Sequence, residues 1–255
     1  MYLCQQIFRK ILSQKIKVAA VSYLNTKPLL YGIERSEIMN EIELVVDYPS
    51  NLARRLREGS IDLALLPVAA MPEIDGARII SDYGIATDGN VVSVALFSQV
   101  PIEEIETVYL DYQSRTSVRL AQVMLQHHWK KEVTYLPAGV DYINDIKDAQ
   151  AGVIIGDRAL QQLDNFKYVY DLSAAWKAHT GLDFIFAAWI ANKDLPASFI
   201  DQFNKANAIG FDHLDEIIAA NPFPEYSMHT YYIDNIKYLL DDKKKAGLKR
   251  FLELI

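Results

Sequence analysis

The chain has 255 residues, of which 51% are hydrophobic and 23% charged, and its net charge is −7 from 33 acidic and 26 basic residues. This length suits one large domain or two lobes, and the composition is ordinary for a protein with a packed core. The acidic balance argues against a nucleic-acid partner, because phosphate binding needs clustered Lys and Arg. The single cysteine, Cys4, excludes a disulfide framework and argues against a cysteine metal site.

The N-terminal segment, MYLCQQIFRKILSQKIK, is basic and mildly amphipathic. It lacks the continuous apolar core of a secretion signal, and no apolar run in the chain approaches the ~20 residues that span a bilayer. We therefore expect residues 1–15 to form an extension on the surface, with no membrane partner, in a cytoplasmic protein. A short helix lying on a membrane surface is the less favoured alternative.

The first part of the chain alternates strands with helices. We expect strands at residues 17–21, 43–47 and 61–67, and helices at 28–35 and 52–58. Pro49 opens the second helix and Gly59 closes it. Residues 77–80 are expected to form a short strand within a loop, and residues 89–98 alternate as a long strand does.

The pattern continues with shorter elements and ends in helices. Strands are expected at residues 107–110, 134–136, 151–155, 168–172 and 184–191. Helices are expected at 118–128, from 158, and around Trp176, followed by three C-terminal helices at 197–221, 230–240 and 243–254.

This order of elements predicts an α/β fold with largely parallel sheets. The two long strands bracket a middle block, so we expect one lobe from residues 16–98 plus 187–255 and a second lobe from residues 99–186. The chain would then cross between the lobes twice. Two-lobed proteins of this kind bind small ligands in the cleft between the lobes and close by hinge motion.

Four polar clusters lie at the ends of predicted strands, where α/β proteins bind ligands. They are residues 22–26 (SYLNT), 90–93 (NVVS), 114–117 (SRTS) and the pair Gly156-Asp157. Hydroxyls beside a helix N-terminus suit a carboxylate, and Arg115 could add a bidentate contact. The alternative for each cluster is a plain helix cap. For Asp157 and for Ser93 within a strand, the structural interpretation is the simpler one.

Other chemistry has little support. None of the histidines has the spacing of a helical metal site, and there is no G-x-S-x-G elbow, Walker loop or dinucleotide fingerprint. The histidines are His127, His128, His179, His213 and His229. We expect Trp129, Trp176 and Trp189 to be packing residues.

Several segments together are similar to one enzyme family. They are SYLNTKPL (22–29), DGNVVSVALFS (88–98), LDYQSRTSVRL (110–120), IIGDRAL (154–160) and DLSAAWKAHTGLDFIFAAW (171–189). In this combination the chain resembles chorismate dehydratase, the first enzyme of the futalosine route to menaquinone, over roughly residues 16–255.

The resemblance implies a two-lobed, periplasmic-binding-protein-like (type II) fold used as a cytoplasmic enzyme, with no cofactor or metal. The implied substrate is chorismate, a dicarboxylate, which loses water to give 3-[(1-carboxyvinyl)oxy]benzoate. Asn25 and Ser93 are the implied catalytic residues, orienting the enolpyruvyl carboxylate and the departing hydroxyl. The predicted substrate-binding set is Ser22, Thr26, Ser114, Arg115, Thr116, Ser117, Gly156 and Asp157.

No histidine or carboxylate in these segments is an obvious general base. We hypothesise that the substrate's own enolpyruvyl carboxylate takes the proton. Three alternatives stay open: 1,4-dihydroxy-6-naphthoate synthase of the same route, which uses a histidine base, a carboxylate-binding receptor without chemistry, and a ligand-sensing domain. The sequence does not give the oligomeric state.

Overall fold

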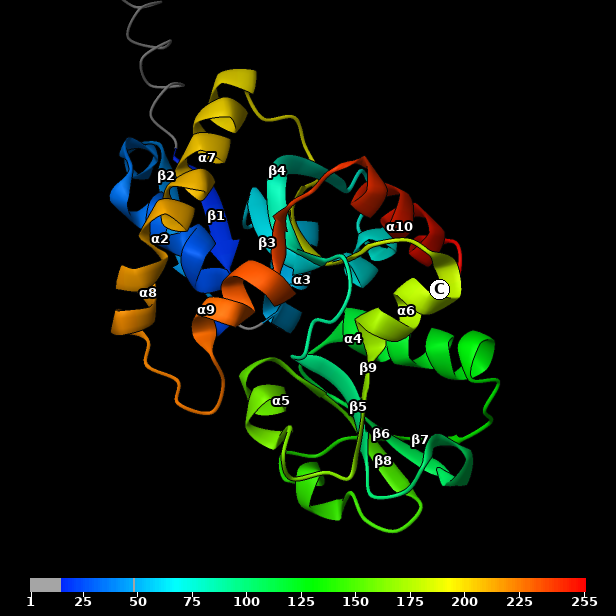
Figure 1. The fold of residues 1–255 in the computed structure, drawn as a ribbon. Coiled ribbons are helices and arrows are strands. Elements are labelled where there is room, and N and C mark those ends of the chain that lie inside the picture. Colours follow the sequence, from blue (N-terminus) through cyan, green and yellow to red (C-terminus); the bar gives the residue numbers. More distant parts are fainter. Residues whose placement is uncertain (1–14, 48) are drawn as a thin grey trace, which may run out of the picture.

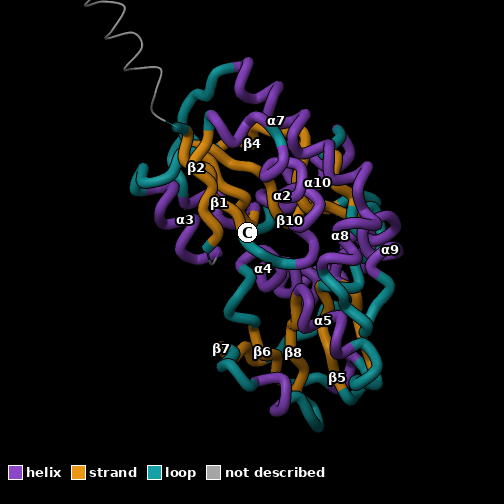
Figure 2. Tube along the Cα trace, turned by 90° about the vertical axis from the view of Figure 1, so that its left-hand side faces the viewer, coloured by secondary structure: helices purple, strands orange, loops and turns teal. Residues whose placement is uncertain are grey.

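The strands of the computed structural model, which describes residues 15–47 and 49–255, form two separate sheets (Figures 1 and 2). The predicted extension at residues 1–15 therefore lies almost wholly outside the described residues. The larger sheet has six strands in the order β11-β4-β10-β3-β1-β2. Their bounds are β1 Ile16–Ala20, β2 Ile42–Val46, β3 Leu63–Pro67, β4 Arg78–Thr87, β10 Phe184–Ala191 and β11 Lys237–Leu239.

The smaller sheet has five strands in the order β7-β6-β8-β5-β9. Their bounds are β5 Val94–Ser98, β6 Thr107–Leu110, β7 Thr134–Pro137, β8 Gln150–Ile155 and β9 Tyr168–Asp171. Both sheets are mixed, because β10 runs antiparallel to β3 and β4, and β5 runs antiparallel to β8 and β9. The prediction of largely parallel sheets is therefore wrong. It rested on the alternation of strands and helices, whereas β5 and β10, the first strand after each change of sheet, run antiparallel to both of their neighbours.

Helices cover both sheets. In the first half of the chain they are α2 Lys27–Arg35, α3 Pro49–Arg57 and α4 Arg115–Val123, which continues as a π-helical turn at Met124–His128. The second half contributes α5 Gly156–Gln162, α6 Leu172–Thr180, α7 Ala197–Ile209, α8 Leu214–Ala220, α9 Met228–Thr230 and α10 Asp242–Leu252. The C-terminal helices α7 to α10, coloured yellow to red in Figure 1, return to the six-stranded sheet.

The region after α8 departs most from the predicted elements. Residues 230–240, expected to be a helix, instead form a π-helical turn at Tyr231–Asn235 followed by β11. The buried positions Ile236, Tyr238 and Leu240 alternate with the half-buried Lys237 and the exposed Leu239, which is the period of a strand. The expected helix at 197–221 is likewise divided by a 3-10 turn at Gly210–His213.

Strand β5 belongs to the smaller sheet, although its residues fall in the first lobe of the predicted division. Residues 89–93 are not part of it, and its residues Val94–Ser98 pair with β8 and β9, in the smaller sheet. Phe184 and Ile185, at the start of β10, pair with β4 in the larger sheet. We therefore propose that the chain crosses at residues 88–93 and 181–183, rather than at 98 and 186.

The core includes two of the three tryptophans. Trp176 and Trp189 are fully buried, and their ring nitrogens donate to Asp183 O and Asn207 Oδ1 at 3.2 and 2.9 Å. Trp129 packs at the edge of the smaller lobe. Among the described residues, no helix is long and apolar enough to cross a membrane.

Candidate functional site

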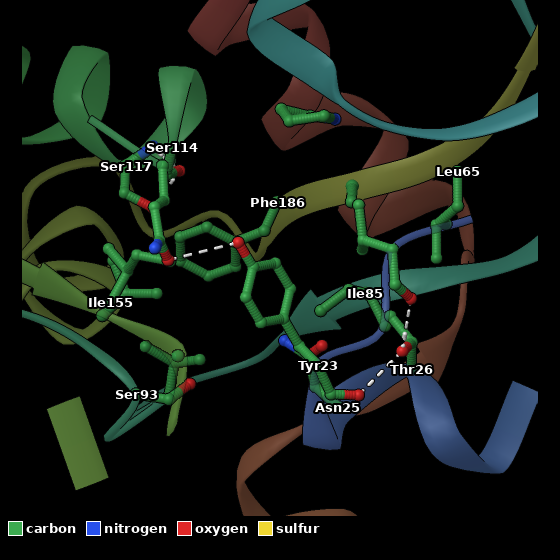
Figure 3. Close-up of a pocket in the computed structure, with 17 residues that line it drawn as sticks. Tyr23, Asn25, Thr26, Leu65, Ile85, Ser93, Ser114, Ser117, Ile155 and Phe186 are labelled. Carbon is green, nitrogen blue, oxygen red and sulfur yellow. Dashed lines mark hydrogen bonds between the residues drawn. The ribbon is translucent and has the colours of Figure 1, made fainter. Parts of the chain in front are cut away.

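A pocket lies between the two sheets, with about 640 Å³ of empty space, part of it open to solvent (Figure 3). The larger sheet contributes Leu65, Ile85 and Phe186 to its apolar wall, and the smaller sheet contributes Val94 and Ile155. Its polar lining residues are Tyr23, Asn25, Thr26, Ser93, Gln113, Ser114 and Ser117. The pocket therefore sits in the cleft that the two-lobed fold predicts.

The SYLNT segment forms the turn between β1 and α2. Residues Leu24–Thr26 make one 3-10 turn, and Pro28 follows in the first turn of α2, where a missing N–H costs nothing. Thr26 Oγ1 lies 2.8 Å from Val21 O and 2.7 Å from Tyr23 O, so its one proton is used inside the turn. Thr26 therefore braces the turn, but the helix-cap interpretation is wrong for its side chain, which accepts no hydrogen bond from a backbone N–H of α2.

Asn25 differs from Thr26 in its hydrogen bonding. Its carbonyl oxygen, Oδ1, is buried and has no hydrogen-bond partner among the described residues. Buried polar atoms are almost always paired, so an unpaired acceptor in a pocket wall needs an explanation. A ligand that donates a hydrogen bond to this oxygen would supply one.

Ser93 lies on the first crossing segment, where the backbone is strained. Val92, a β-branched residue, has a φ of 56°, which is unusual for such a side chain. The adjacent Ser93 N donates a hydrogen bond of 2.6 Å to Val91 O, which closes a tight turn. One carboxylate oxygen of Asp171 holds this turn by accepting from Val91 N at 2.9 Å and Val92 N at 2.7 Å. Strain that is held in this way beside a pocket is typical of functional sites.

Asp171 also caps α6, since its other oxygen accepts from Ser173 N and Ala174 N, both at 2.9 Å. Burial raises the pKa of this carboxyl, and the four backbone N–H groups oppose the rise. Asp171 therefore joins α6 to the backbone that presents Ser93.

The SRTS segment begins α4. Ser114 is the N-cap residue, and its hydroxyl accepts from Ser117 N at 3.1 Å and lies 2.8 Å from Ser117 Oγ. Both hydroxyls line the pocket. Thr116 points elsewhere, since its Oγ1 accepts from Ala69 N of the other lobe at 3.1 Å, and Arg115 pairs with Glu73 at the surface.

The last predicted cluster opens α5. Gly156 lines the pocket with a φ of 63°, and a side chain there would approach the Tyr23 ring. Asp157 Oδ1 accepts from Leu24 N across the lobes at 3.3 Å, and burial raises the pKa of this carboxyl. Ser22 is exposed and accepts from Lys27 Nζ at 3.1 Å.

The structure thus brings six of the predicted residues into one pocket. They are Asn25, Thr26, Ser93, Ser114, Ser117 and Gly156, whereas Ser22, Arg115, Thr116 and Asp157 lie beside it. Sequence reasoning missed Tyr23 and Gln113, whose side chains meet across the pocket at 3.3 Å. Both lie within the quoted segments SYLNTKPL (22–29) and LDYQSRTSVRL (110–120), and that membership was the available signal.

The pocket wall carries almost no ionisable group. Among the described lining residues, only Tyr23 has an ionisable side chain. Burial, aided by the charge of Asp111, raises the pKa of Tyr23 to about 12, so it stays neutral. His127 and His128 lie in the π-helical turn after α4, and the His128 ring packs against Trp129 and His179. Neither histidine lines the pocket.

The chain is similar to known proteins over most of its length. A family model described as menaquinone biosynthesis matches residues 16–255. A chorismate dehydratase of Thermus thermophilus is 26% identical over 91% of this chain and 92% of its own length. A chorismate dehydratase of Campylobacter jejuni is 27% identical over 91% of this chain and 94% of its own length.

A solved structure shows the fold relationship. A Candida albicans protein, described as having the generic periplasmic binding protein fold, superposes with a TM-score of 0.65 at 13% identity over 94% of this chain and 90% of that one. The predicted fold class is therefore confirmed. Because the family model covers all but the first fifteen residues, the chain belongs to the menaquinone biosynthesis family and has a periplasmic-binding-protein-like fold.

Proposed function

We propose that this protein is a chorismate dehydratase, which removes water from chorismate to give 3-[(1-carboxyvinyl)oxy]benzoate. The two chorismate dehydratases described above support this activity, since each matches nearly the whole chain. As part of the same proposal, the enzyme works in the cytoplasm, in the futalosine route to menaquinone.

One observation carries the mechanism: the pocket offers hydrogen-bonding groups but no general base. Its described lining residues include amides and hydroxyls, and the one phenol stays protonated. The reaction removes a proton from ring C3 and the hydroxyl from C4, and it makes the ring aromatic. Because the substrate supplies this driving force, the protein has to hold the reacting groups in place and exclude water.

The base that removes the C3 proton is therefore a group of the substrate itself. The enolpyruvyl carboxylate is attached at C3 and can take the C3 proton when the pocket holds it over the ring. The same proton is afterwards available to the hydroxyl that leaves C4, so water departs and the protons balance. Asn25 and Ser93, which face the pocket together, orient the enolpyruvyl group and this hydroxyl.

The other carboxylate suits the N-terminus of α4. The hydroxyls of Ser114 and Ser117 face the pocket there, and the first N–H groups of a helix favour an anion. Phe186 and Ile155 provide an apolar surface for the ring (Figure 3). The histidine base that the naphthoate synthase alternative needs is not among the described lining residues, which favours the dehydratase.

The test is incubation of the purified protein with chorismate, following loss of the diene absorbance and the mass of the product. We expect a product lighter by one water molecule. Binding without turnover would instead favour a receptor. Turnover at the normal rate of a chorismate analogue that lacks the enolpyruvyl carboxylate would contradict the substrate as base.

A further inference from the structure

The Tyr231 hydroxyl contacts Ser93, one of the two residues that we place at the reacting centre, although Tyr231 lies outside the segments that suggested the family. It belongs to the π-helical turn Tyr231–Asn235, between α9 and β11. Its side chain is fully buried, and its hydroxyl donates to Ser93 Oγ at 2.8 Å. Single π-helical turns are frequent at functional sites, and this local geometry agrees with a role beside the pocket.

The contact determines whether the Ser93 hydroxyl donates or accepts a hydrogen bond in the pocket. A serine hydroxyl has one proton to donate and lone pairs that accept. Because Tyr231 donates to Ser93 Oγ, the serine proton is left free to point into the pocket. Burial raises the pKa of Tyr231, and its contacts with Ser93 and Asn25 lower it by less, so the phenol keeps its proton.

The polarity of Asn25 follows from its carbonyl oxygen, Oδ1, which is buried without a partner among the described residues. An amide oxygen only accepts hydrogen bonds. The Asn25 side chain is also among the groups that lower the pKa of Tyr231. Asn25 therefore presents an acceptor, and Ser93 presents a donor.

A hydroxyl is the group that fits one acceptor and one donor together. It donates to Asn25 Oδ1 and accepts from Ser93 Oγ. Resting on the proposed function, we propose that Tyr231 is a positioning residue that sets Ser93 as donor to the C4 hydroxyl of chorismate, while Asn25 accepts from the same hydroxyl. The donated hydrogen bond stabilises negative charge on the leaving oxygen as the C4–O bond breaks.

A second contact of the same turn supports this role. Asn235 Nδ2 donates to Asn90 O at 3.2 Å, and Tyr226 OH donates to Asn235 Oδ1 at 3.0 Å. The segment that carries Tyr231 thus also holds the crossing segment on which Ser93 lies. Its distance from Ser93 along the chain is 138 residues, so no local pattern connects the two.

The test is Tyr231→Phe, which keeps the ring and removes only the hydroxyl. We expect kcat to fall by about tenfold or more, below the ~10²–10³ typical of losing a direct donor, with a smaller change in KM. Tyr232→Phe is the matched control, since the neighbouring Tyr232 hydroxyl is buried without a partner among the described residues. It should leave kcat unchanged.

A double variant separates positioning from a general loss of structure. If Tyr231 acts through Ser93, then Tyr231→Phe should cost little further activity in a Ser93→Ala background. Wild-type kcat in Tyr231→Phe, or losses that multiply in full in the double variant, would overturn the inference. Wild-type turnover of chorismate is measured alongside, and its absence would count against the proposed function instead.

A second substitution at position 231 tests the inference if the Tyr231→Phe protein does not fold. A 3,5-difluorotyrosine at position 231 keeps the ring and the hydroxyl but lowers the pKa of the phenol. We expect a new loss of kcat on the alkaline side of the pH profile, absent when the same residue stands at position 232. An unchanged profile would overturn the inference.

Discussion

The two polar sides of the pocket are built in different ways. On the side of Asn25 and Ser93, a buried carbonyl oxygen has no partner among the described residues, and the backbone is strained at Val92. On the side of Ser114 and Ser117, the hydroxyls bond to each other and cap a regular helix. In Figure 3 the two sides lie apart in the view, with Tyr23 between them.

The difference indicates that the first side takes part in the chemistry and the second side in binding. Unpaired groups and strain persist only where the surrounding structure holds them, and they mark the place where a reacting group is met. A relaxed helix cap is satisfied without a ligand, and it adds binding to a structural role. Changes on the first side should therefore alter kcat, and changes on the second side should alter KM and stability.

The largest effect is expected for Asn25→Ala. Removing the free acceptor should lower the single-turnover rate by about 10²–10³, the usual cost of losing one oriented polar group at a reacting centre. The matched control is Asn165→Ala, because Asn165 is exposed in the smaller lobe and bonds only within its own turn and to Gln99. A wild-type single-turnover rate in Asn25→Ala would remove Asn25 from the chemistry.

A smaller and different effect is expected for Ser114→Ala. Loss of the N-cap should cost about 1 kcal/mol, which lowers Tm by about 2–4 °C in a protein of this size. KM for chorismate should rise by about two- to tenfold, the worth of one neutral hydrogen bond, with little change in kcat.

The control for this variant is Asp241→Ala, which removes the cap of α10 away from the pocket. It should lower Tm without changing KM. A fall in kcat for Ser114→Ala larger than its rise in KM would erase the proposed contrast between the two sides.

The contrast also explains what the sequence could predict. SYLNT and SRTS are local strand–helix junctions, so a strand pattern, a capping residue and the resemblance sufficed to bring Asn25 and Ser114 to one cleft. Asp171 and Tyr231 reach the Ser93 segment from 79 and 138 residues away, and only the packed fold reveals those contacts. The same holds for β11, whose strand character depends on the free edge of β4.

The smallest effect is expected at Asp157, which links the two sides through Leu24 N. Burial raises the pKa of its carboxyl, while the Leu24 hydrogen bond and the charge of Lys27 oppose the rise. Because this pKa is higher in the folded state, the stability from the group is fully present below the unfolded value of about 3.9. It is lost as the pH rises through the folded value.

Asp157→Asn should therefore raise Tm slightly at pH 7, since the amide keeps an acceptor for Leu24 N and carries no charge to desolvate. The advantage should shrink as the pH is lowered toward 4, where the wild-type carboxyl is itself protonated. Thermal unfolding at several pH values measures this, with Asp75→Asn, an exposed carboxylate, as control. A Tm below wild type at pH 7 that recovers as the pH is lowered would contradict this expectation, because the charged carboxylate would then contribute more through Leu24 N and Lys27 than its burial costs.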